Sequence, residues 1–529
     1  MKKTFYITTP IYYPSARLHI GHAYCSTMAD TIARYHRAKG DDTYFLTGSD
    51  EHGEKIQKNA EAKGVTPKEF VDEIVLGIKK LWKDMDVRYD DYIRTTDERH
   101  ERVVQEVFSR LLAQDDIYLG EYEGWYCTPC ESFWTDSQAG ENHICPDCGR
   151  PVHKAKEEAY FFRMSKYADK LLKFYDEHPG FITPESRKNE MINSFIKPGL
   201  EDLCVSRTTF TWGIPVKENP RHVVYVWLDA LLNYVSALGY LSDDTTKFDK
   251  YWSDDATILH LVGNDITRFH VIYWPIFLMA LGLRIPDRVF VHGLIMMKDE
   301  KMSKSKGNVV APEPLIEKYG LDAVRYYLVR ETTFGGDGSF TPEQFVDRVN
   351  VDLANDFGNL LNRTVAMITK YFGGIIPNYD GCKTTFDEEL EMFGRNTISS
   401  YHDNMESLRV TEAYIDVLNY VARANKYIEE CKPWELARDE SKKDVLASCM
   451  NHLANTLRQA AIMLSPVLIE APKKLYAQLG IEENNQTFES LDKFDVLGGE
   501  TVTKGNPLFP RLDAKIEVEY IKDLMKNNK

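Results

Sequence analysis

The chain has 529 residues, of which 43% are hydrophobic and 28% are charged, and its formal net charge is −16 at pH 7. This length exceeds what one hydrophobic core supports and predicts about three to four domains. No stretch approaches the ~20 uninterrupted apolar residues of a membrane-spanning helix, and no secretory segment opens the chain, so we expect a cytoplasmic protein. The acidic balance excludes a uniformly basic, non-specific nucleic-acid binder, although it is compatible with one local basic track.

Strands and helices alternate over the N-terminal part of the chain. Short runs rich in β-branched and aromatic residues predict strands at residues 4–9 and 42–47, and a helical apolar period predicts a helix at residues 20–39 between them. Further helices follow through Leu112. Such alternation is typical of a doubly wound parallel sheet, and we expect one half of that sheet here.

The alternation breaks at a stretch rich in Tyr, Cys and Gly and resumes at His222. We expect the second half of the sheet to contain the segments at residues 222–228, 257–262, 269–281 and 288–292. The stretch between the halves is then an insertion into one split Rossmann domain. Gly263 and Asp265 follow one of these strands and His292 ends another, where open α/β sheets bind their ligands.

The C-terminal part of the sequence is helical. Apolar residues at helical spacing form one stripe from Val410 to Ile428 and another from Leu446 to Leu464, which predicts helices packed in a bundle. We expect five segments: the first half of the α/β domain at residues 1–116, the insertion at 117–220, the second half at 221–300, a connecting region at 301–350 and the α-helical bundle at 351–529.

Four of the nine cysteines are clustered, and the odd total argues against a disulfide framework. The cluster forms two C-x2-C pairs, whose spacing lets four thiolates surround one Zn²⁺ ion tetrahedrally. Its members are Cys127, Cys130, Cys145 and Cys148. Four protein ligands leave no position for a reactive water, so the expected zinc is structural. An iron–sulfur or redox centre is the alternative for the same residues.

Two short motifs lie far apart in the sequence, and both suit a charged nucleoside phosphate. His19-Ile20-Gly21-His22 follows the first predicted strand and opens a helix, so its imidazoles and N–H groups face an anion at the helix N-terminus. Lys301-Met302-Ser303-Lys304-Ser305 is a lysine loop suited to stabilising charge as a polyphosphate is cleaved. Each motif alone is a weak signal, with two unrelated surface loops as the alternative, but together they indicate one site.

This pair of motifs resembles the signatures of class I aminoacyl-tRNA synthetases, and the remaining motifs resemble the methionyl family across nearly the whole chain. The resemblance implies that methionine and ATP form methionyl-adenylate and pyrophosphate, and that methionyl then passes to the 3′-terminal adenosine of tRNA(Met), including the initiator tRNA. The resemblance implies four catalytic residues, which act on the phosphates of ATP together with Mg²⁺. They are His19, His22, Lys301 and Lys304. The further ATP contacts that it implies are Gly21, Gly263 and Asp265. A lone Asp at a strand end is otherwise often a helix cap.

The resemblance also implies a methionine pocket with aromatic and aliphatic walls and a few polar groups. The matching positions are Ile11, Tyr13, Asp50, Trp227, Ala230, Leu231, Tyr234 and His292. This composition suits a thioether, because aromatic edges stabilise a polarizable sulfur and Asp50 can accept from the substrate ammonium group. Tyr234 and His292 can donate to the sulfur. Without the resemblance, Trp227 and Tyr234 are more typical of a hydrophobic core.

The positions that match the CAU-anticodon contacts of the methionyl family lie in the helical part and are Asn359, Arg363, Pro433 and Trp434. Asn359 and Arg363 are spaced to share one helix face, from which both can hydrogen-bond base edges. Trp434 offers a ring on which a splayed base can stack. On its own, Trp434 would more often be a packing residue.

Other enzyme classes fit less of the sequence. Valine, isoleucine and leucine ligases need a far larger editing insertion, because apolar pockets separate such substrates by only ~1 to 3 kcal/mol. A cysteinyl enzyme needs zinc at its amino acid pocket, whereas the four cysteines form a closed set. A nucleotidyltransferase shares the histidine motif but needs no helical bundle, and a non-catalytic tRNA-binding regulator would have damaged motifs. Since the chain stops at Lys529, before the dimerisation module of some relatives, we expect a monomer.

Overall fold

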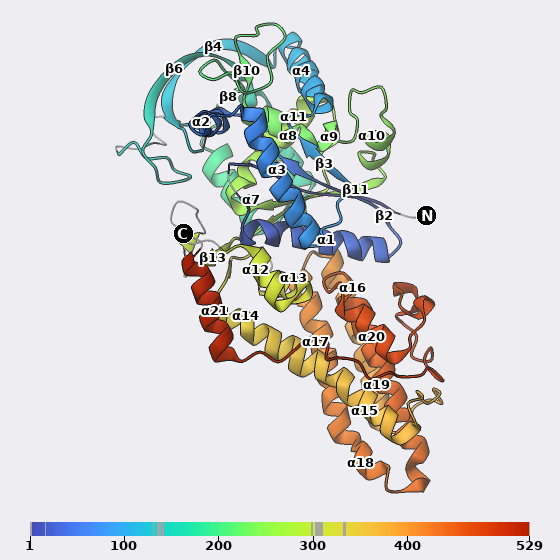
Figure 1. The fold of residues 1–529 in the computed structure, drawn as a ribbon. Helices are drawn as coiled ribbons and strands as arrows, with labels where there is room; N and C mark the ends of the chain where they lie inside the picture. The colour runs from blue at the N-terminus through green and yellow to red at the C-terminus, as the bar shows by residue number, and fades with distance from the viewer. Residues whose placement is uncertain are drawn as a thin grey trace. The chain divides into compact units, whose positions relative to one another are not determined.

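The computed structural model describes residues 3–15, 17–130, 132–134, 139, 142–297, 300–301, 310–331 and 335–527. These residues form two compact units (Figure 1). The first unit contains residues 1–18, 41–83 and 88–292, and the second contains residues 19–40, 84–87 and 293–529. None of the helices in the described part of the chain has the length and apolar character that crossing a membrane requires.

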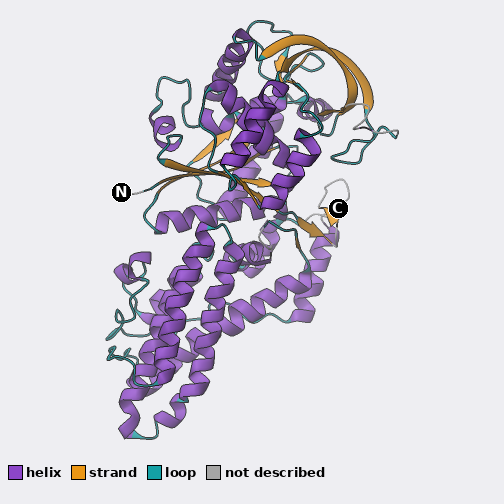
Figure 2. Cartoon of the chain, turned by 180° about the vertical axis from the view of Figure 1, so that it is seen from behind, coloured by secondary structure: helices purple, strands orange, loops and turns teal. Residues whose placement is uncertain are grey.

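A six-stranded parallel sheet forms the centre of the first unit (Figure 2). Its strands are β1 (Thr4–Tyr12), β2 (Asp42–Ser49), β3 (Asp91–Arg94), β7 (Ile182–Thr183), β11 (Ala256–Gly263) and β12 (Arg288–His292). They lie in the order β3-β2-β1-β11-β12-β7, and every neighbouring pair is parallel. Because β1 pairs with β11, the two halves of the sequence meet within one split, doubly wound sheet, and the predicted fold class is confirmed.

Helices bury apolar faces in the same core as the strands. Phe108 on α4 (Glu98–Ala113) and Phe277 on α11 (Trp274–Leu281) belong to one buried cluster with Tyr6 of β1 and Ile258 of β11. Sheets buried on both sides need such near-continuous apolar strands. The other helices of this unit are α2 (Glu54–Lys63), α3 (Pro67–Asp84), α6 (Ala168–Glu177), α7 (Glu185–Met191), α8 (Val226–Leu231), α9 (Asn233–Ser236) and α10 (Thr246–Tyr251).

Two elements of this unit differ from the prediction. Residues 222–228 contain only the short strand β10 (Val223–Val224), which pairs with β9 (Ser206–Arg207) outside the central sheet, and the chain then enters α8. A short buried apolar run does not distinguish a strand from a helix, and this segment is part strand and part helix and contributes no strand to the central sheet. The sixth strand of the sheet, β7, comes instead from the predicted insertion.

The insertion forms an antiparallel sheet of its own. β4 (Ile117–Cys127) pairs with β6 (His153–Phe162) along almost its whole length, and β5 (Ser132–Trp134) and β8 (Leu203–Cys204) flank this pair. At the far end of the hairpin, Trp134 and Val152 share a small buried cluster with cysteines of the predicted metal site. A core of this size stabilises only a few residues. We therefore expect an additional cross-link to hold this end of the hairpin in place.

The second unit is mainly helical. The three long helices α16 (Thr385–Glu406), α17 (Val410–Cys431) and α19 (Lys443–Leu464) contact one another, and both predicted apolar stripes are buried between them. The bundle prediction is therefore confirmed. The other helices are α1 (Ile20–Ala38), α12 (Pro312–Tyr319), α13 (Leu321–Glu331), α14 (Pro342–Arg348), α15 (Asn359–Phe372), α18 (Pro433–Leu436), α20 (Ala471–Leu479) and α21 (Ala514–Asn527).

A three-stranded sheet begins the C-terminal part of this unit. It consists of β13 (Ile295–Met297), β14 (Glu300–Lys301) and β15 (Gly338–Ser339). Gly293 must be glycine, because a Cβ atom there would lie 1.8 Å from the carbonyl oxygen of Gly336. The glycine-rich connecting region is thus paired with the strand that follows Gly293. The five domain boundaries that we expected stay predictions.

Candidate active site

The residues expected to bind methionine all belong to the first unit. Ile11 lies near the end of β1, and Asp50 directly follows β2, where its N–H donates to the carbonyl oxygen of Tyr12 at 3.0 Å. Gly263 and His292 are register partners at the ends of β11 and β12. Ile11 packs against the same core cluster as the residues on α8 and α9, namely Trp227, Leu231 and Tyr234. The carboxyl ends of four adjacent strands therefore form the region where sheets of this kind bind ligands.

Two aromatic rings lie flat against each other in this region. Trp227 on α8 stacks on Phe269, with ring centroids 3.4 Å apart and an interplanar angle of 9°. The indole nitrogen of Trp227 is buried and has no hydrogen-bond partner among the described residues. A buried donor without a partner costs free energy, so a ligand that accepts from this N–H would gain affinity.

Tyr234 and His270 form a buried hydrogen-bonded pair. His270 Nδ1 is 3.0 Å from the carbonyl oxygen of Ile266, which can only accept, so Nδ1 carries the ring proton. Nε2 is then an acceptor, and the Tyr234 hydroxyl donates to it at 2.7 Å. Burial lowers the pKa of His270 to about 4, so the ring stays neutral at pH 7. The hydroxyl has one proton, so in this arrangement Tyr234 does not donate to a sulfur atom.

A second neutral histidine supports the ring of Tyr234. His260 stacks on it with centroids 4.2 Å apart. The Trp274 indole N–H donates to His260 Nε2 at 3.1 Å, so Nδ1 carries the proton and lies 2.7 Å from Thr8 Oγ1. Burial holds the pKa of His260 well below its ordinary value. Neutral imidazoles thus pack around Tyr234 without bringing charge into the core.

A buried carboxylate fixes the helix that carries Trp227. Asp229 on α8 accepts from His52 Nδ1 at 2.7 Å and from His100 Nε2 at 2.8 Å, and His100 Nδ1 lies 2.7 Å from Ser236 Oγ. Burial disfavours ionisation of Asp229, but the two histidines outweigh it and lower the carboxyl pKa. Burial likewise opposes protonation of His52, yet Asp229 raises the pKa of this imidazole. The pair therefore ties α8 to the segment after β2, where Asp50 lies.

In the second unit, the histidine motif caps helix α1. His19 Nδ1 accepts from the Gly21 N–H at 3.1 Å, and His22 Nδ1 accepts from the His19 N–H at 3.2 Å. A neutral ring whose Nδ1 accepts carries its proton on Nε2, so both imidazoles have Nε2–H as their donor. The ring centroids are 4.0 Å apart at the N-terminus of a 19-residue helix, where the helix dipole favours an anion. A Cβ atom on Gly21 would lie 3.0 Å from the His19 ring, which explains the glycine.

The lysine loop is described only at its start. Lys301 belongs to β14 and pairs in register with Met296 of β13. The side chain of Lys301 and the whole of Lys304 lie outside the described residues. Their predicted roles therefore stay predictions.

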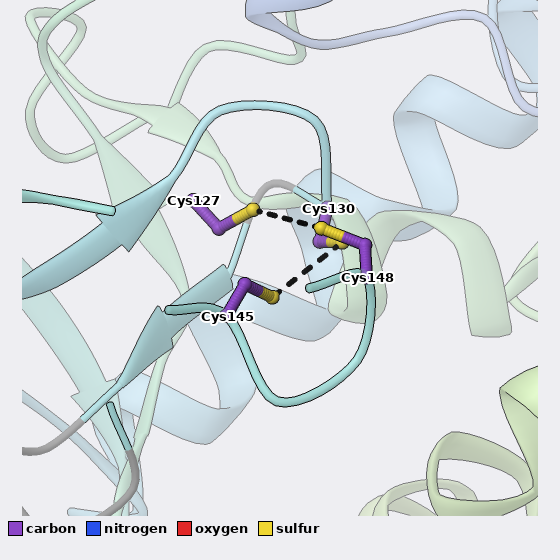
Figure 3. A group of neighbouring side chains, drawn as sticks. All are labelled: Cys127, Cys130, Cys145 and Cys148. Atoms are coloured by element: carbon purple, nitrogen blue, oxygen red, sulfur yellow. Dashed lines mark hydrogen bonds between the residues drawn. The ribbon is translucent and has the colours of Figure 1, made fainter. Parts of the chain in front are cut away.

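The four clustered cysteines converge at the end of the insertion hairpin (Figure 3). Their sulfur atoms lie within 4.8 Å of one another, with Cys127 and Cys148 at 3.6 Å and Cys130 and Cys145 at 3.8 Å. Zinc–sulfur bonds of about 2.3 Å at tetrahedral angles require sulfur separations of about 3.8 Å. Burial raises the pKa of Cys127 to about 12, so a thiolate there needs a neighbouring cation. The predicted group can thus hold a metal ion, and its geometry is compatible with zinc.

Comparisons with known proteins place the chain in a family. The family described as "tRNA synthetases class I (M)" matches residues 5–155 and 148–365. Methionine–tRNA ligase of Halalkalibacterium halodurans is 58% identical over 100% of this chain and 81% of its own length. The corresponding protein of Bacillus subtilis is 55% identical over 99% of this chain and 80% of its own length. The chain belongs to the methionine–tRNA ligases.

Solved structures agree with this assignment. Methionyl-tRNA synthetase of Mycobacterium tuberculosis, bound by methionyl-adenylate, matches with a TM-score of 0.91 and 38% identity over 96% of this chain and 100% of that chain. The apo form of the same protein matches with a TM-score of 0.84 and 35% identity over 97% of this chain and 99% of that chain. The predicted family is therefore confirmed, and the chain is a ligase that joins methionine to tRNA.

The residues that match the family's anticodon contacts lie in the second unit. Asn359 is exposed at the start of α15, and Arg363, one turn later, donates to Glu429 Oε1 on α17 at 2.6 Å. Lys432, in the left-handed conformation with φ 47°, ends α17, and buried Pro433 starts α18. Trp434 is 38% exposed. The structure thus brings Arg363 to the end of α17 that leads into Trp434, although the two segments are far apart in sequence.

Sequence reasoning missed several residues of the catalytic unit. The sequence placed Phe269 and His270 only in a segment of the second half of the α/β domain, yet they contact Trp227 and Tyr234 respectively. An aromatic residue and a histidine directly after the Gly263 strand end were a signal that could have selected them. Asp229 gave no such signal, because only the fold brings it to the two histidines.

Proposed function

We propose that this ligase activates methionine with ATP to form methionyl-adenylate and pyrophosphate, and then transfers methionyl to the 3′-terminal adenosine of tRNA(Met), including the initiator tRNA. The observation that carries the proposal is the aromatic site at the carboxyl ends of β1, β2, β11 and β12, where Trp227 stacks on Phe269 and Tyr234 pairs with His270. The Mycobacterium tuberculosis neighbour, described as bound by methionyl-adenylate, supports the same intermediate here.

Each polar group of this site has a proposed task toward methionine. Asp50, which is 8% exposed, accepts from the substrate ammonium group. The Trp227 N–H donates to a ligand acceptor, because it has no partner among the described side chains. The thioether packs against aromatic edges, and the neutral Tyr234–His270 pair keeps charge away from the sulfur. Ile11, Tyr13, Ala230, Leu231 and His292 complete the proposed pocket.

The proposed treatment of ATP uses the ends of helices and strands. The Nε2–H groups of His19 and His22 donate to phosphate oxygens. Asp265, exposed just after β11, accepts from a ribose hydroxyl, and Gly21 and Gly263 let the nucleotide approach the main chain. Lys301 and Lys304 neutralise the departing pyrophosphate. Mg²⁺ bound with ATP would add positive charge at the phosphates.

The remaining proposals concern the metal, the tRNA and the cell. One structural Zn²⁺ ion binds the four cysteines of the insertion, which supply the softness and tetrahedral spacing that zinc prefers. Asn359, Arg363, Pro433 and Trp434 bind the CAU anticodon. We also propose that the enzyme works in the cytoplasm, and that the chain acts as a monomer.

Amino-acid-dependent ATP–pyrophosphate exchange tests the activation step. Zinc-replete enzyme is assayed with the twenty amino acids in parallel, and the assay is repeated with Trp227→Ala and with Trp434→Ala, an exposed tryptophan of the helical unit, as a control. Exchange with methionine alone, lost in Trp227→Ala and kept in the control, is the expected result. Exchange that no amino acid supports, or that another amino acid supports better, would overturn the proposal.

A further inference from the structure

We infer that Cys382, Glu391 and His452 bind a divalent metal ion in the helical unit, and that zinc fits this ligand set best. The site is separate from the four-cysteine cluster and independent of the proposed reaction. Cys382 precedes α16, Glu391 lies on α16 and His452 lies on α19. Their ligand atoms all lie within 4.8 Å of one another. One ion would therefore join three points of the bundle.

The three ligand atoms form a triangle of the size that zinc requires. His452 Nε2 is 3.2 Å from Glu391 Oε1, Cys382 Sγ is 3.5 Å from the same oxygen, and Sγ is 3.9 Å from Nε2. Zinc bonds of about 2.3 Å to sulfur and about 2.0–2.2 Å to nitrogen and oxygen, at tetrahedral angles, require separations of about 3.4–3.6 Å. The observed distances differ from these by a few tenths of an ångström, so no backbone movement is needed.

The His452 ring is oriented as a metal ligand. Its Nδ1 is 2.8 Å from the carbonyl oxygen of Ser448, so Nδ1 carries a proton and donates it there. Metal-binding histidines commonly use the second ring nitrogen in this way, because the bond fixes the tautomer and directs the other lone pair to the metal. In a neutral ring, the Nε2 lone pair would face the carboxylate oxygen of Glu391. A cation between the two atoms removes this repulsion.

Glu391 Oε1 is crowded if no metal is bound. It accepts from the Tyr379 hydroxyl at 2.7 Å and also has the Cys382 sulfur and His452 Nε2 as neighbours, while Arg395 donates to Oε2 at 2.6 Å. If Nε2 also carries a proton, three donors compete for the lone pairs of this oxygen; if it does not, the Nε2 lone pair faces the oxygen. An ion would take the place of the thiol proton and of a second imidazole proton. The Tyr379 and Arg395 bonds would remain as support for the carboxylate.

The surroundings suit a soft divalent cation and allow it to enter. The carboxylates of Glu391, Asp387 and Glu388 all act on the position of the Cys382 sulfur, and their negative charge favours a cation there. Glu391 and His452 are buried, whereas Cys382 is half-buried. A thiolate, an imidazole and a carboxylate together form a ligand set typical of zinc, and three protein ligands leave a fourth position for water.

The competing explanation is a protonated network without metal. His452 would then be an imidazolium paired with Glu391, and the Cys382 thiol would donate to the same carboxylate. Metal content separates the two explanations, because the network holds no ion. The measurement therefore needs no knowledge of tRNA or of catalysis.

Zinc per chain, measured by elemental analysis of the full-length protein after exchange into metal-free buffer, is the first experiment. Wild-type protein should hold about two zinc ions, and Cys382→Ser and His452→Gln about one each. The control Glu388→Gln, an exposed carboxylate beside the site, should keep both ions. The reciprocal double variant Cys145→Ser/Cys148→Ser should keep the ion of the helical unit and lose the ion of the insertion.

A zinc count that does not change in Cys382→Ser, or Cys145→Ser/Cys148→Ser protein that holds no zinc, would overturn the inference. These results leave the proposed activation of methionine untouched, since pyrophosphate exchange tests that separately. If Cys382→Ser does not fold, Co²⁺ titration of Cys145→Ser/Cys148→Ser gives the answer. Thiolate-to-cobalt absorption at one equivalent supports the site, and its absence there contradicts it.

Discussion

Buried histidines of the catalytic unit show how one residue type takes opposite electrostatic roles. His52 faces the carboxylate of Asp229, which raises its pKa against the effect of burial. His270 faces a carbonyl oxygen and a tyrosine hydroxyl, neither of which carries charge, and burial lowers its pKa to about 4. The partner atom, rather than the histidine, therefore decides in which direction the pKa of each ring shifts.

Acid should destabilise the enzyme partly through His270. Its native pKa of about 4 is below the ordinary 6.5, so between these values the unfolded chain binds a proton that the native chain does not. The free energy of unfolding should then decrease as the pH is lowered from 6.5 to about 4, by about 1.4 kcal/mol per pH unit for this proton. His52 has the opposite sign, because its raised pKa contributes stability that is lost as pH rises through the native value.

Denaturant melts at half-unit pH steps from 7 to 4 check this effect. His270→Gln removes the titrating group and should flatten the slope in that window relative to wild type. His178→Gln, at an exposed ring, is the matched control and should leave the slope unchanged. Equal slopes for wild type and His270→Gln would contradict the assignment.

The hydroxyl of Tyr234 should matter for methionine binding, because it holds His270 in place. Tyr234→Phe leaves the buried Nε2 atom without its donor at 2.7 Å. We expect KM for methionine in pyrophosphate exchange to rise about tenfold, corresponding to about 1.4 kcal/mol, with a smaller change in kcat. Tyr118→Phe in the insertion is the control. Equal KM values for the two variants would contradict a role of the Tyr234 hydroxyl in methionine binding.

At the scale of elements, helix α8 is held by ionic contacts that lie beneath the aromatic site. Asp229 is fully buried and binds His52 and His100, which belong to other segments of the first unit. Removing one partner of a buried ion pair leaves an uncompensated charge. The position of Trp227, two residues earlier on the same helix, therefore depends on a residue that touches no proposed ligand.

Asp229→Asn should destabilise the protein by about 3–5 kcal/mol, because it removes the buried carboxylate that accepts from both His52 and His100. Denaturant unfolding followed by tryptophan fluorescence measures this change. Asp243→Asn changes the same residue type at an exposed position and should alter stability by less than about 0.5 kcal/mol. Equal effects of the two substitutions would show that the network contributes nothing specific.

Metal removal should loosen the end of the insertion hairpin. Trp125 stacks on His143 with centroids 3.7 Å apart, and Trp134 packs beside Cys127 and Cys145. A strong chelator should change the fluorescence of these tryptophans and expose thiols to a colorimetric reagent, because so small a core depends on its cross-link. Zinc, added back, should restore both signals. No change on chelation of protein shown to contain zinc would contradict a structural role.

At the scale of the whole molecule, the proposed methionine pocket and the proposed anticodon contacts belong to different units. The proposed methionine site lies within the first unit, and Asn359, Arg363 and Trp434 lie within the second. The ion pair between Arg363 and Glu429 is exposed, so it contributes little stability and can be exchanged for contacts with a base. Damage to the anticodon residues should therefore spare amino acid activation.

Trp434→Ala should lower kcat/KM for aminoacylation of tRNA(Met) about 5- to 100-fold, because the variant loses the stacking of one base, which contributes ~1–3 kcal/mol. Methionine-dependent pyrophosphate exchange should stay within about twofold of wild type. Met392→Ala removes another exposed apolar side chain of the second unit and serves as the control. Equal losses in both assays would indicate a folding defect rather than a lost anticodon contact.

The sequence by itself determined the parts whose signal is local. Strand and helix periods predicted β1, α1, β2, α17 and α19, and the cysteine spacing predicted a group that the structure brings within metal-binding distance. Short motifs and the family resemblance predicted the ligase. These features depend on neighbours in the chain, which is the information that a sequence states directly.

Only the tertiary structure decided the contacts between distant segments. It placed residues 222–228 outside the central sheet, took β7 from the insertion, and brought His270 to Tyr234 and Asp229 to His52. It also joined Cys382 to His452 across the bundle. Such pairs arise from the packing of whole helices and strands, so no spacing rule within the sequence predicts them.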